Sequence, residues 1–213
     1  MGDIKNQNSK AGYEYLLAYK LTVPIYDLTM EFVNRCSPYT RNRSPQSPLS
    51  PPLSPGNSPG FPPLSSNRTF DQMVQAARSG MQNIPEGFKQ QSLAGYIKLS
   101  GVSRGYLEEL LNDYLSYARQ NHIEVWDKEK AKREIRELGE IWGIINKNPS
   151  LPSQPNFPYL PEDQTKAVNL LITLIQQANY LIDKLIESLK QKHTKEGGFN
   201  ENLLKRRLEY KNR

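Results

Sequence analysis

Hydrophobic residues recur every three or four positions over most of the chain, which is the spacing of helices with one apolar face. Three such stretches predict helices over about residues 12–36, 68–90 and 93–121. A fourth and longest helix is predicted over 161–192, where Glu162 and Asp163 suit a helix N-terminus. No alternating apolar and polar run indicates a sheet. The pattern predicts an all-α protein whose antiparallel helices bury their apolar stripes as a bundle.

Proline-rich stretches interrupt the helical pattern. More than half of the positions in 37–67 are Pro or Ser, and proline lacks a backbone donor, so we expect a disordered, extended linker there. Its Ser-Pro pairs leave open an alternative role as kinase or adaptor sites. Residues 148–161 form a second loop with regularly spaced prolines, and the polar residues 1–11 a flexible N-terminus.

Two further segments lie outside the four bundle helices. A charged helix is predicted over 127–146, with Asp127 as its N-cap, inserted between the third and last bundle helices. The suffix 197–213 begins with Gly197 and Gly198, and we expect a short basic helix after them. Its apolar residues are predicted to share one side, which would dock onto protein, RNA or the bundle itself; they are Phe199, Leu203, Leu204 and Leu208.

Glycines inside the predicted helices indicate places where helices meet. Gly80 and Gly87 in the second helix predict either a bend or a close approach by a neighbour, because glycine has no Cβ. Gly101 and Gly105 in the third helix predict a tight crossing in the same way.

The positive charge is concentrated at the C-terminus. The 213 residues carry a formal charge of +6, and residues 190–213, with eight basic and three acidic side chains, account for +5 of it. A basic arm binds polyanions through phosphate contacts, without reading bases. A solubilising tail is the alternative.

Catalytic and metal-binding patterns are scarce. The chain has one cysteine, Cys36, and two histidines, His122 and His193, which are far apart in sequence. We therefore expect neither an enzyme nor a cofactor or metal site. No stretch approaches the roughly 18 apolar residues of a membrane span, so we expect a cytoplasmic protein without membrane contact.

Basic and aromatic residues on the second and third helices suggest binding to nucleic acid. Tyr96, Tyr106, Tyr114 and Tyr117 lie among them, either to stack unpaired bases or to pack where helices meet. The candidate nucleic-acid-binding residues are Lys89, Lys98, Arg104 and Arg119, with Lys205, Arg206 and Arg207 in the suffix.

Two segments resemble a known family. The sequence ARSGMQNIPEG, residues 77–87, resembles the Ala-Arg-Ser-x-x-x-Asn-Ile-x-Glu-Gly signature of four-helix-bundle proteins encoded in ribosomal RNA intervening sequences. SRGYLEELLNDY, residues 103–114, is similar to the family's Arg-Gly-x-Leu-x-Glu-Leu stretch. The last helix followed by EGGFNENLLKRR resembles the branch with a C-terminal suffix. This family includes the accessory variability determinants of diversity-generating retroelements.

The resemblance implies an up-down antiparallel four-helix bundle, here with an inserted charged helix and a basic suffix helix, that assembles as a homopentamer. In the retroelement branch it implies binding to a reverse transcriptase and to structured RNA or an RNA/DNA hybrid, in support of mutagenic cDNA synthesis. A protein-interaction scaffold with no retroelement role is the alternative.

The family signature falls on residues that we interpret as structural: Arg78, Asn83, Glu86 and Gly87. Because buried charges need partners, Glu86 is expected to pair with Arg78 or Arg104, inside the bundle or at a subunit contact. The chain departs from the family at Pro85, where alanine is common, and in the long Pro/Ser linker that replaces a short loop.

Overall fold

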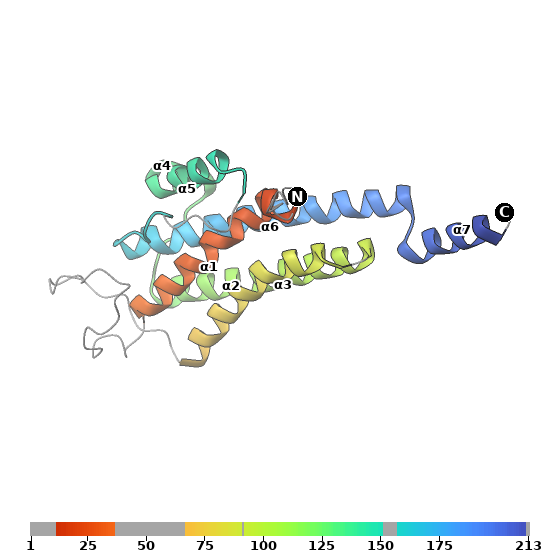
Figure 1. Cartoon of the computed structure of the whole chain (residues 1–213). Coiled ribbons are helices and arrows are strands. Elements are labelled where there is room, and N and C mark those ends of the chain that lie inside the picture. Colours follow the sequence, from red (N-terminus) through yellow and green to blue (C-terminus); the bar gives the residue numbers. More distant parts are fainter. Residues whose placement is uncertain (1–11, 37–66, 91, 151–156, 212–213) are drawn as a thin grey trace, which may run out of the picture.

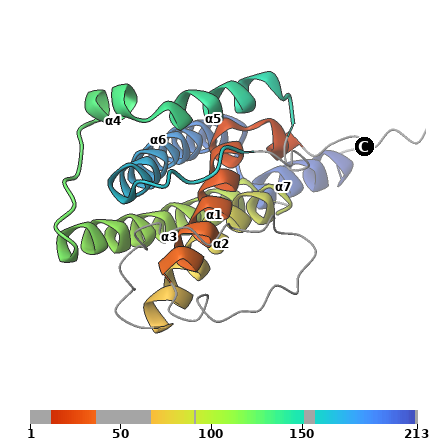
Figure 2. The same ribbon diagram turned by 90° about the vertical axis from the view of Figure 1, so that its left-hand side faces the viewer.

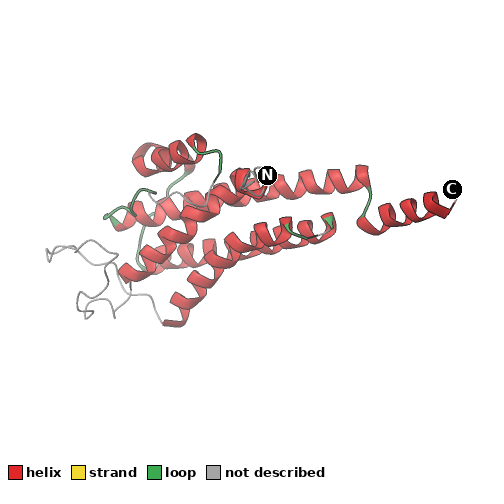
Figure 3. Cartoon of the chain, viewed as in Figure 1, coloured by secondary structure: helices red, strands yellow, loops and turns green. Residues whose placement is uncertain are grey.

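The computed structural model describes residues 12–36, 67–90, 92–150 and 157–211, and all regular structure in these ranges is helical (Figure 3). The all-α prediction is therefore confirmed for the described residues. The predictions for 1–11 and for the linker up to residue 66 lie outside them. The elements are η1 (Gly12–Tyr15), α1 (Leu17–Cys36), α2 (Asn67–Phe88), α3 (Leu93–Gln120), α4 (Lys128–Glu134), α5 (Arg136–Lys147), α6 (Gln164–Glu196) and α7 (Phe199–Lys211).

Four long helices, α1, α2, α3 and α6, enclose the core (Figure 1). Helix α2 packs against α1 and α3, and α6 packs against α3 and α1, so that each of the four has two neighbours. Helix α6, at 33 residues, is about 50 Å long. It begins one turn later than expected, with Asp163 as its N-cap accepting a hydrogen bond from the Lys166 amide at 2.8 Å.

An aromatic cluster fills the core between α1 and α3. The Phe32 ring meets the rings of Tyr114 and Tyr117 edge to face, with centroid distances of 5.1 and 5.0 Å. The Tyr114 hydroxyl donates to Thr29 Oγ1 at 3.1 Å, and the Cys36 thiol lies 3.7 Å from the Tyr117 hydroxyl. These polar groups therefore find partners inside the core, which limits the cost of burying them.

Glycine allows α2 and α3 to approach closely. A Cβ at Gly80 would lie 2.6 Å from Leu107 Cδ2, and the Ser103 hydroxyl donates to the Gly80 carbonyl. The close approach predicted at this glycine is confirmed. The tight crossing predicted at Gly101 and Gly105 is wrong within this chain, because both are exposed and a Cβ on either would meet no atom within 4 Å.

The single charged helix predicted over 127–146 is wrong in one respect: it is two helices, α4 and α5. The break falls at Ile135, whose backbone is extended (φ −112°, ψ 101°) and whose side chain is buried. Helix α4 packs on α6 and α5 on both α1 and α6, and the two short helices lie across one side of the bundle (Figure 2). The predicted cap is confirmed, since Asp127 accepts from the Lys130 amide at 2.7 Å.

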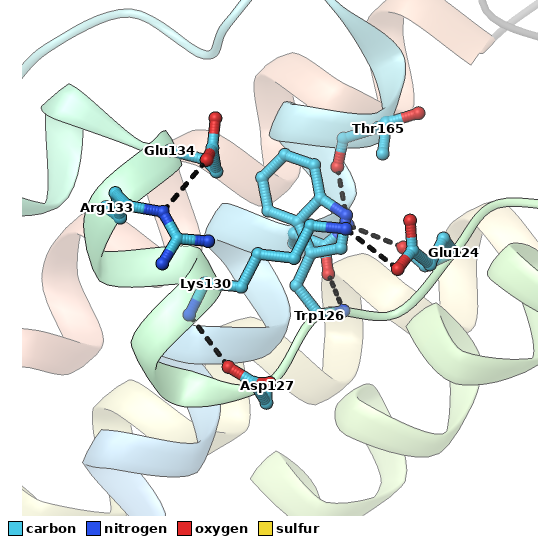
Figure 4. A network of polar contacts seen from close by, with 8 residues as sticks. Glu124, Trp126, Asp127, Lys130, Arg133, Glu134 and Thr165 are labelled. Atoms are coloured by element: carbon cyan, nitrogen blue, oxygen red, sulfur yellow. Dashed lines mark hydrogen bonds and ion pairs between the residues drawn. The ribbon is translucent and has the colours of Figure 1, made fainter.

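Buried polar side chains attach this insertion to the bundle. Asn169 of α6 donates to the carbonyls of Glu124 and Thr165 at 2.9 and 2.8 Å, and accepts from the Trp126 amide at 2.7 Å. Around this connection, Lys130 Nζ lies 5.1 Å from the centre of the Trp126 ring and 2.8 Å from Glu124 (Figure 4). At the far end of the insertion, buried Lys20 donates to the Asn148 carbonyl at 2.7 Å. The insertion is thus held at both ends.

Candidate nucleic-acid interface

Helix α7 lies beyond the four packed helices, at the end of the molecule where α6 terminates (Figure 1). Gly197 ends α6 with a left-handed backbone (φ 75°), a conformation that glycine adopts without strain, and its amide donates to the His193 carbonyl. The Glu201 carboxylate accepts from the Gly198 amide at 3.0 Å at the start of α7. This turn aims α7 away from the bundle.

The surface of α7 is open to solvent. Apart from half-buried Asn202, every α7 side chain that the structure describes is exposed. The prediction of one apolar side is wrong: residues advance by about 100° around a helix, so Leu204 and Leu208 lie roughly opposite Phe199. The apolar residues thus divide into two groups on different sides of the helix.

The predicted basic cluster Lys205, Arg206 and Arg207 sits in the middle of α7. All three side chains are exposed, and none forms an ion pair with another described residue. Three consecutive helical residues point in three directions, so their charges surround the helix and do not form one face. Such an arrangement favours a polyanion that contacts α7 from several sides.

The last turns of α6 extend this basic region. Lys190, Lys192 and Lys195 are exposed there, and only a long contact of 3.9 Å links Lys192 to Glu196. These lysines contributed to the predicted +5 but were not among the candidate residues. The clustering of basic residues over 190–213 was the sequence signal that could have identified them.

The candidates on α2 and α3 fall at two ends of the molecule. Lys89 and Lys98 are exposed near the α2–α3 junction, which lies at the same end as α7 (Figure 1). Arg119 is exposed in the last turn of α3, about 30 Å from Lys98 along the helix axis. The structure therefore places Lys89 and Lys98 on the α7 side and leaves Arg119 far from them.

Arg104 is engaged within the protein. Its guanidinium donates to Glu108 at 2.6 Å and to Asp183 of α6 at 3.2 Å. Partial burial opposes the charge of Arg104, but these two carboxylates outweigh it and raise the pKa. Glu108 also accepts from Asn179 at 3.2 Å. We interpret Arg104 as a link between α3 and α6, with little of its charge available to a phosphate.

Most of the tyrosines proposed for base stacking are inside the protein. Tyr96, Tyr114 and Tyr117 are buried and Tyr106 is half-buried, so packing between helices is the role that the structure gives them. Burial raises the pKa of Tyr96 to about 12. An exposed aromatic ring is instead found on α7 at Tyr210, which is 82% exposed beside the basic cluster. In the sequence, the position of Tyr210 among the basic residues of the tail was the signal that could have identified it as a stacking residue.

The residues of segment 77–87 do not form an ion pair within the chain. Arg78 and Glu86 are both exposed and neither forms an ion pair with a described residue, so Glu86 does not pair with Arg78 or Arg104 inside the bundle. The same pairing at a subunit contact stays a prediction. Asn83 donates to the Ser79 carbonyl at 2.7 Å within α2. Gly87 is structural, because a Cβ there would lie 2.7 Å from Tyr96 Cδ2.

We also considered a metal site, a reactive cysteine, a ligand pocket and a membrane-spanning helix over the described residues 12–36, 67–90, 92–150 and 157–211. No three His, Cys, Asp or Glu side chains in these ranges gather to hold a metal ion. Cys36 is buried, which raises the pKa of its thiol to about 11 and makes it a poor nucleophile. A hollow of about 660 Å³ between α5 and Phe157–Tyr159 is open and shallow. None of the described helices has the length and apolar character needed to cross a membrane.

Comparisons with models of known families, with curated proteins and with solved structures give no match.

Proposed function

We propose that this chain is an oligomeric RNA-binding adaptor and that α7, with the end of α6, holds the phosphate backbone of a structured RNA. The observation that carries the proposal is the exposed cluster of Lys205, Arg206 and Arg207, which stands clear of the bundle without acidic partners among the described residues. Exposed basic side chains without acidic partners bind phosphates and release the counterions of the RNA, which favours binding without base recognition.

The position of the other cations supports an RNA surface at one end of the molecule. Lys190, Lys192 and Lys195 continue the basic region along α6, and Lys89 and Lys98 lie at the same end. Tyr210 adds an exposed ring on which an unpaired base can stack. A structured RNA, which offers both a backbone and unpaired bases, matches this combination.

The resemblance to the intervening-sequence family makes the proposal more specific. We propose an up-down antiparallel bundle of α1, α2, α3 and α6, assembled as a homopentamer that supports mutagenic cDNA synthesis by a reverse transcriptase. The contacts of α2 with α1 and α3, and of α6 with α3 and α1, support a four-helix bundle. The RNA, or an RNA/DNA hybrid, would be the template held near that enzyme.

A protein-interaction scaffold is the second candidate function. It is favoured by the apolar residues that α7 exposes, since large exposed apolar side chains mark protein contacts. Salt dependence separates the two, because phosphate contacts weaken with salt whereas apolar contacts do not.

The test is the affinity for a structured RNA, measured from about 50 to 200 mM salt. The variant Lys205→Gln/Arg206→Gln/Arg207→Gln is compared with Lys128→Gln/Lys132→Gln/Lys147→Gln, which removes the same charge from α4 and α5. We expect the α7 variant to lower the slope of log affinity against log salt by about 2 to 3, and the control to leave it close to wild type. A slope of zero in the wild type, or equal slopes in all three proteins, would refute RNA binding through α7.

A further inference from the structure

Helix α7 receives almost no support from the rest of the protein. Among the described residues no helix packs along it, and it leaves the bundle at the Gly197–Gly198 turn (Figure 1). Its leucines stay open to solvent, since Leu203, Leu204 and Leu208 are each at least half exposed. In most proteins, burial of one apolar face supplies most of the stability of a helix. Helix α7 lacks that contribution.

Side-chain hydrogen bonds hold only the first turn of α7. The Glu201 carboxylate accepts from the Gly198 amide at 3.0 Å, as the third residue of a helix does in a capping box. The Asn202 side chain donates to the Glu196 carbonyl at 3.1 Å and ties the same turn to the end of α6. No side chain of residues 203–211 forms a hydrogen bond or an ion pair with another described residue. The later turns therefore depend on backbone hydrogen bonds.

A helix of this length is marginal in water without packing. Isolated helices shorter than about 12–15 residues form in only part of the molecules, because the gain per residue barely exceeds the loss of conformational freedom. Helix α7 has 13 residues. Its leucines and basic residues favour a helix, whereas the like charges of Arg207 and Lys211, one turn apart, oppose it. The helical and unfolded forms of residues 203–211 are thus close in free energy.

Phosphates shift this balance toward the helix. The four basic residues of α7 span about 9 Å along the axis of a helix but about 20 Å along an extended chain; they are Lys205, Arg206, Arg207 and Lys211. The helix therefore has the higher density of positive charge, which repels itself when no anion is present and attracts phosphates more strongly. Basic segments that are unfolded alone can fold when they bind RNA.

We infer that RNA binding is coupled to the folding of α7. Residues 203–211 are helical in only part of the free molecules, the bound phosphates complete the helix, and the structure shows the helical form. This inference rests on the RNA-binding function proposed above and adds a conformational step to it. Because only the helical fraction of the free molecules is ready to bind, a change in the stability of the helix changes the RNA affinity.

The first test compares two variants of the full chain that differ in helix propensity alone. Leu204→Gly/Leu208→Gly and Leu204→Ala/Leu208→Ala remove the same exposed leucines and keep every basic residue, but each glycine favours the helix about four- to fivefold less than alanine. We expect the glycine variant to bind a structured RNA at least about fivefold more weakly than the alanine variant. The slope of log affinity against log salt should be the same in both, because their charges are the same.

Folding and the proposed function are controlled in the same experiment. Because α7 lies outside the core, chemical denaturation should give equal free energies of unfolding for the two variants. Equal RNA affinities of the two variants would refute the coupling and, where the salt slope is retained, leave RNA binding through α7 standing. A wild-type affinity without any salt slope would instead overturn the proposed function, and the coupling with it.

The second test is hydrogen exchange of the wild-type chain with and without the same RNA. In the free chain, the amides of residues 203–211 should exchange within about tenfold of the rate of an unfolded chain, and bound RNA should slow them at least about tenfold further. The amides in the middle of α3 are the control and should not change. Protection of residues 203–211 in the free chain as strong as that of α3, or no added protection with RNA, would contradict the inference.

Discussion

A Cβ on Gly80 would lie 2.6 Å from Leu107 Cδ2, so the α2–α3 contact depends on the absence of a side chain at Gly80. We predict that Gly80→Ala lowers the free energy of unfolding by about 1–3 kcal/mol, the usual effect of overpacking a core. Gly105→Ala is the matched control on α3. Its Cβ meets open space, and alanine should stabilise the helix by about 0.5–1 kcal/mol. Chemical denaturation measures both, and equal effects of the two substitutions would contradict the packing.

Burial of the Cys36 thiol makes the protein less stable at alkaline pH. Burial raises its pKa from 9.0 to about 11, so above pH 9 the unfolded chain loses the proton while the folded chain keeps it. The stability that the protonated thiol allows is fully present below pH 9 and is lost as the pH rises to about 11. The free energy of unfolding then falls by up to about 2–3 kcal/mol.

The measurement is the free energy of unfolding between pH 8 and 12. Tyr96, with its pKa raised to about 12, adds a further decline that starts near its ordinary value of 10.0. In Cys36→Ala the decline should begin about one pH unit later, near the Tyr96 range. A Cys36→Ala protein that declines from pH 9 like the wild type would show that the thiol is not responsible.

Asn169 connects α6 with the loop that leads into α4. We predict that Asn169→Ala costs about 2–4 kcal/mol, because it leaves the Trp126 amide and the Glu124 carbonyl without their partner. In this variant, hydrogen exchange should become faster in α4 than it is in the wild type, and should change less in α2. The exposed Asn112→Ala on α3 is the control and should have an effect within about 0.5 kcal/mol. Unchanged exchange in α4 would mean that other contacts hold the insertion.

Substitutions of Arg104 and Lys98 should have opposite effects, one on stability and the other on RNA binding. Arg104→Gln removes the partner of Glu108 and Asp183 and should destabilise the protein by about 0.5–1 kcal/mol, a small value because these groups are partly exposed. RNA affinity should stay within about twofold of wild type, a range that corresponds to less than 1 kcal/mol.

Lys98→Gln is expected to do the reverse. Lys98 is exposed and forms no ion pair with a described residue, so its loss should leave stability unchanged and lower the salt slope of RNA binding by about 1. If Arg104→Gln weakens RNA binding more than Lys98→Gln, the arginine is available to phosphate and the roles of the two residues are reversed.

The helices and their ends could be predicted from the sequence because the responsible forces act within a few residues. The three- and four-residue spacing of apolar positions located α2, α3 and α6 to within about four residues. The first helix was predicted five residues too early, because Gly12–Tyr15 form the separate element η1 and α1 begins at Leu17. Asp127 and Asp163 are caps because each accepts from an amide only three positions away. The break at Ile135 was missed because the apolar spacing of a helix continues across it, whereas the backbone of Ile135 is extended.

The candidate site was predicted less completely. The basic tail was found because clustering of charge is visible along the chain, and α7 confirms that Lys205, Arg206 and Arg207 are exposed. The single apolar side of α7 was wrong because consecutive apolar residues, Leu203 and Leu204, point about 100° apart on a helix. That error concealed the division of the apolar residues into two groups on different sides of α7.

The sequence by itself determined an all-helical chain with a basic, glycine-hinged C-terminal segment, because helical periodicity, capping and charge are local properties. Only the tertiary structure decided that Gly80 meets Leu107 while Gly101 meets nothing, and that Arg104 faces Asp183, 79 positions away, instead of solvent. Such contacts depend on which side of each helix turns toward a distant neighbour. That choice is set by packing of the whole core, which no short stretch of sequence records.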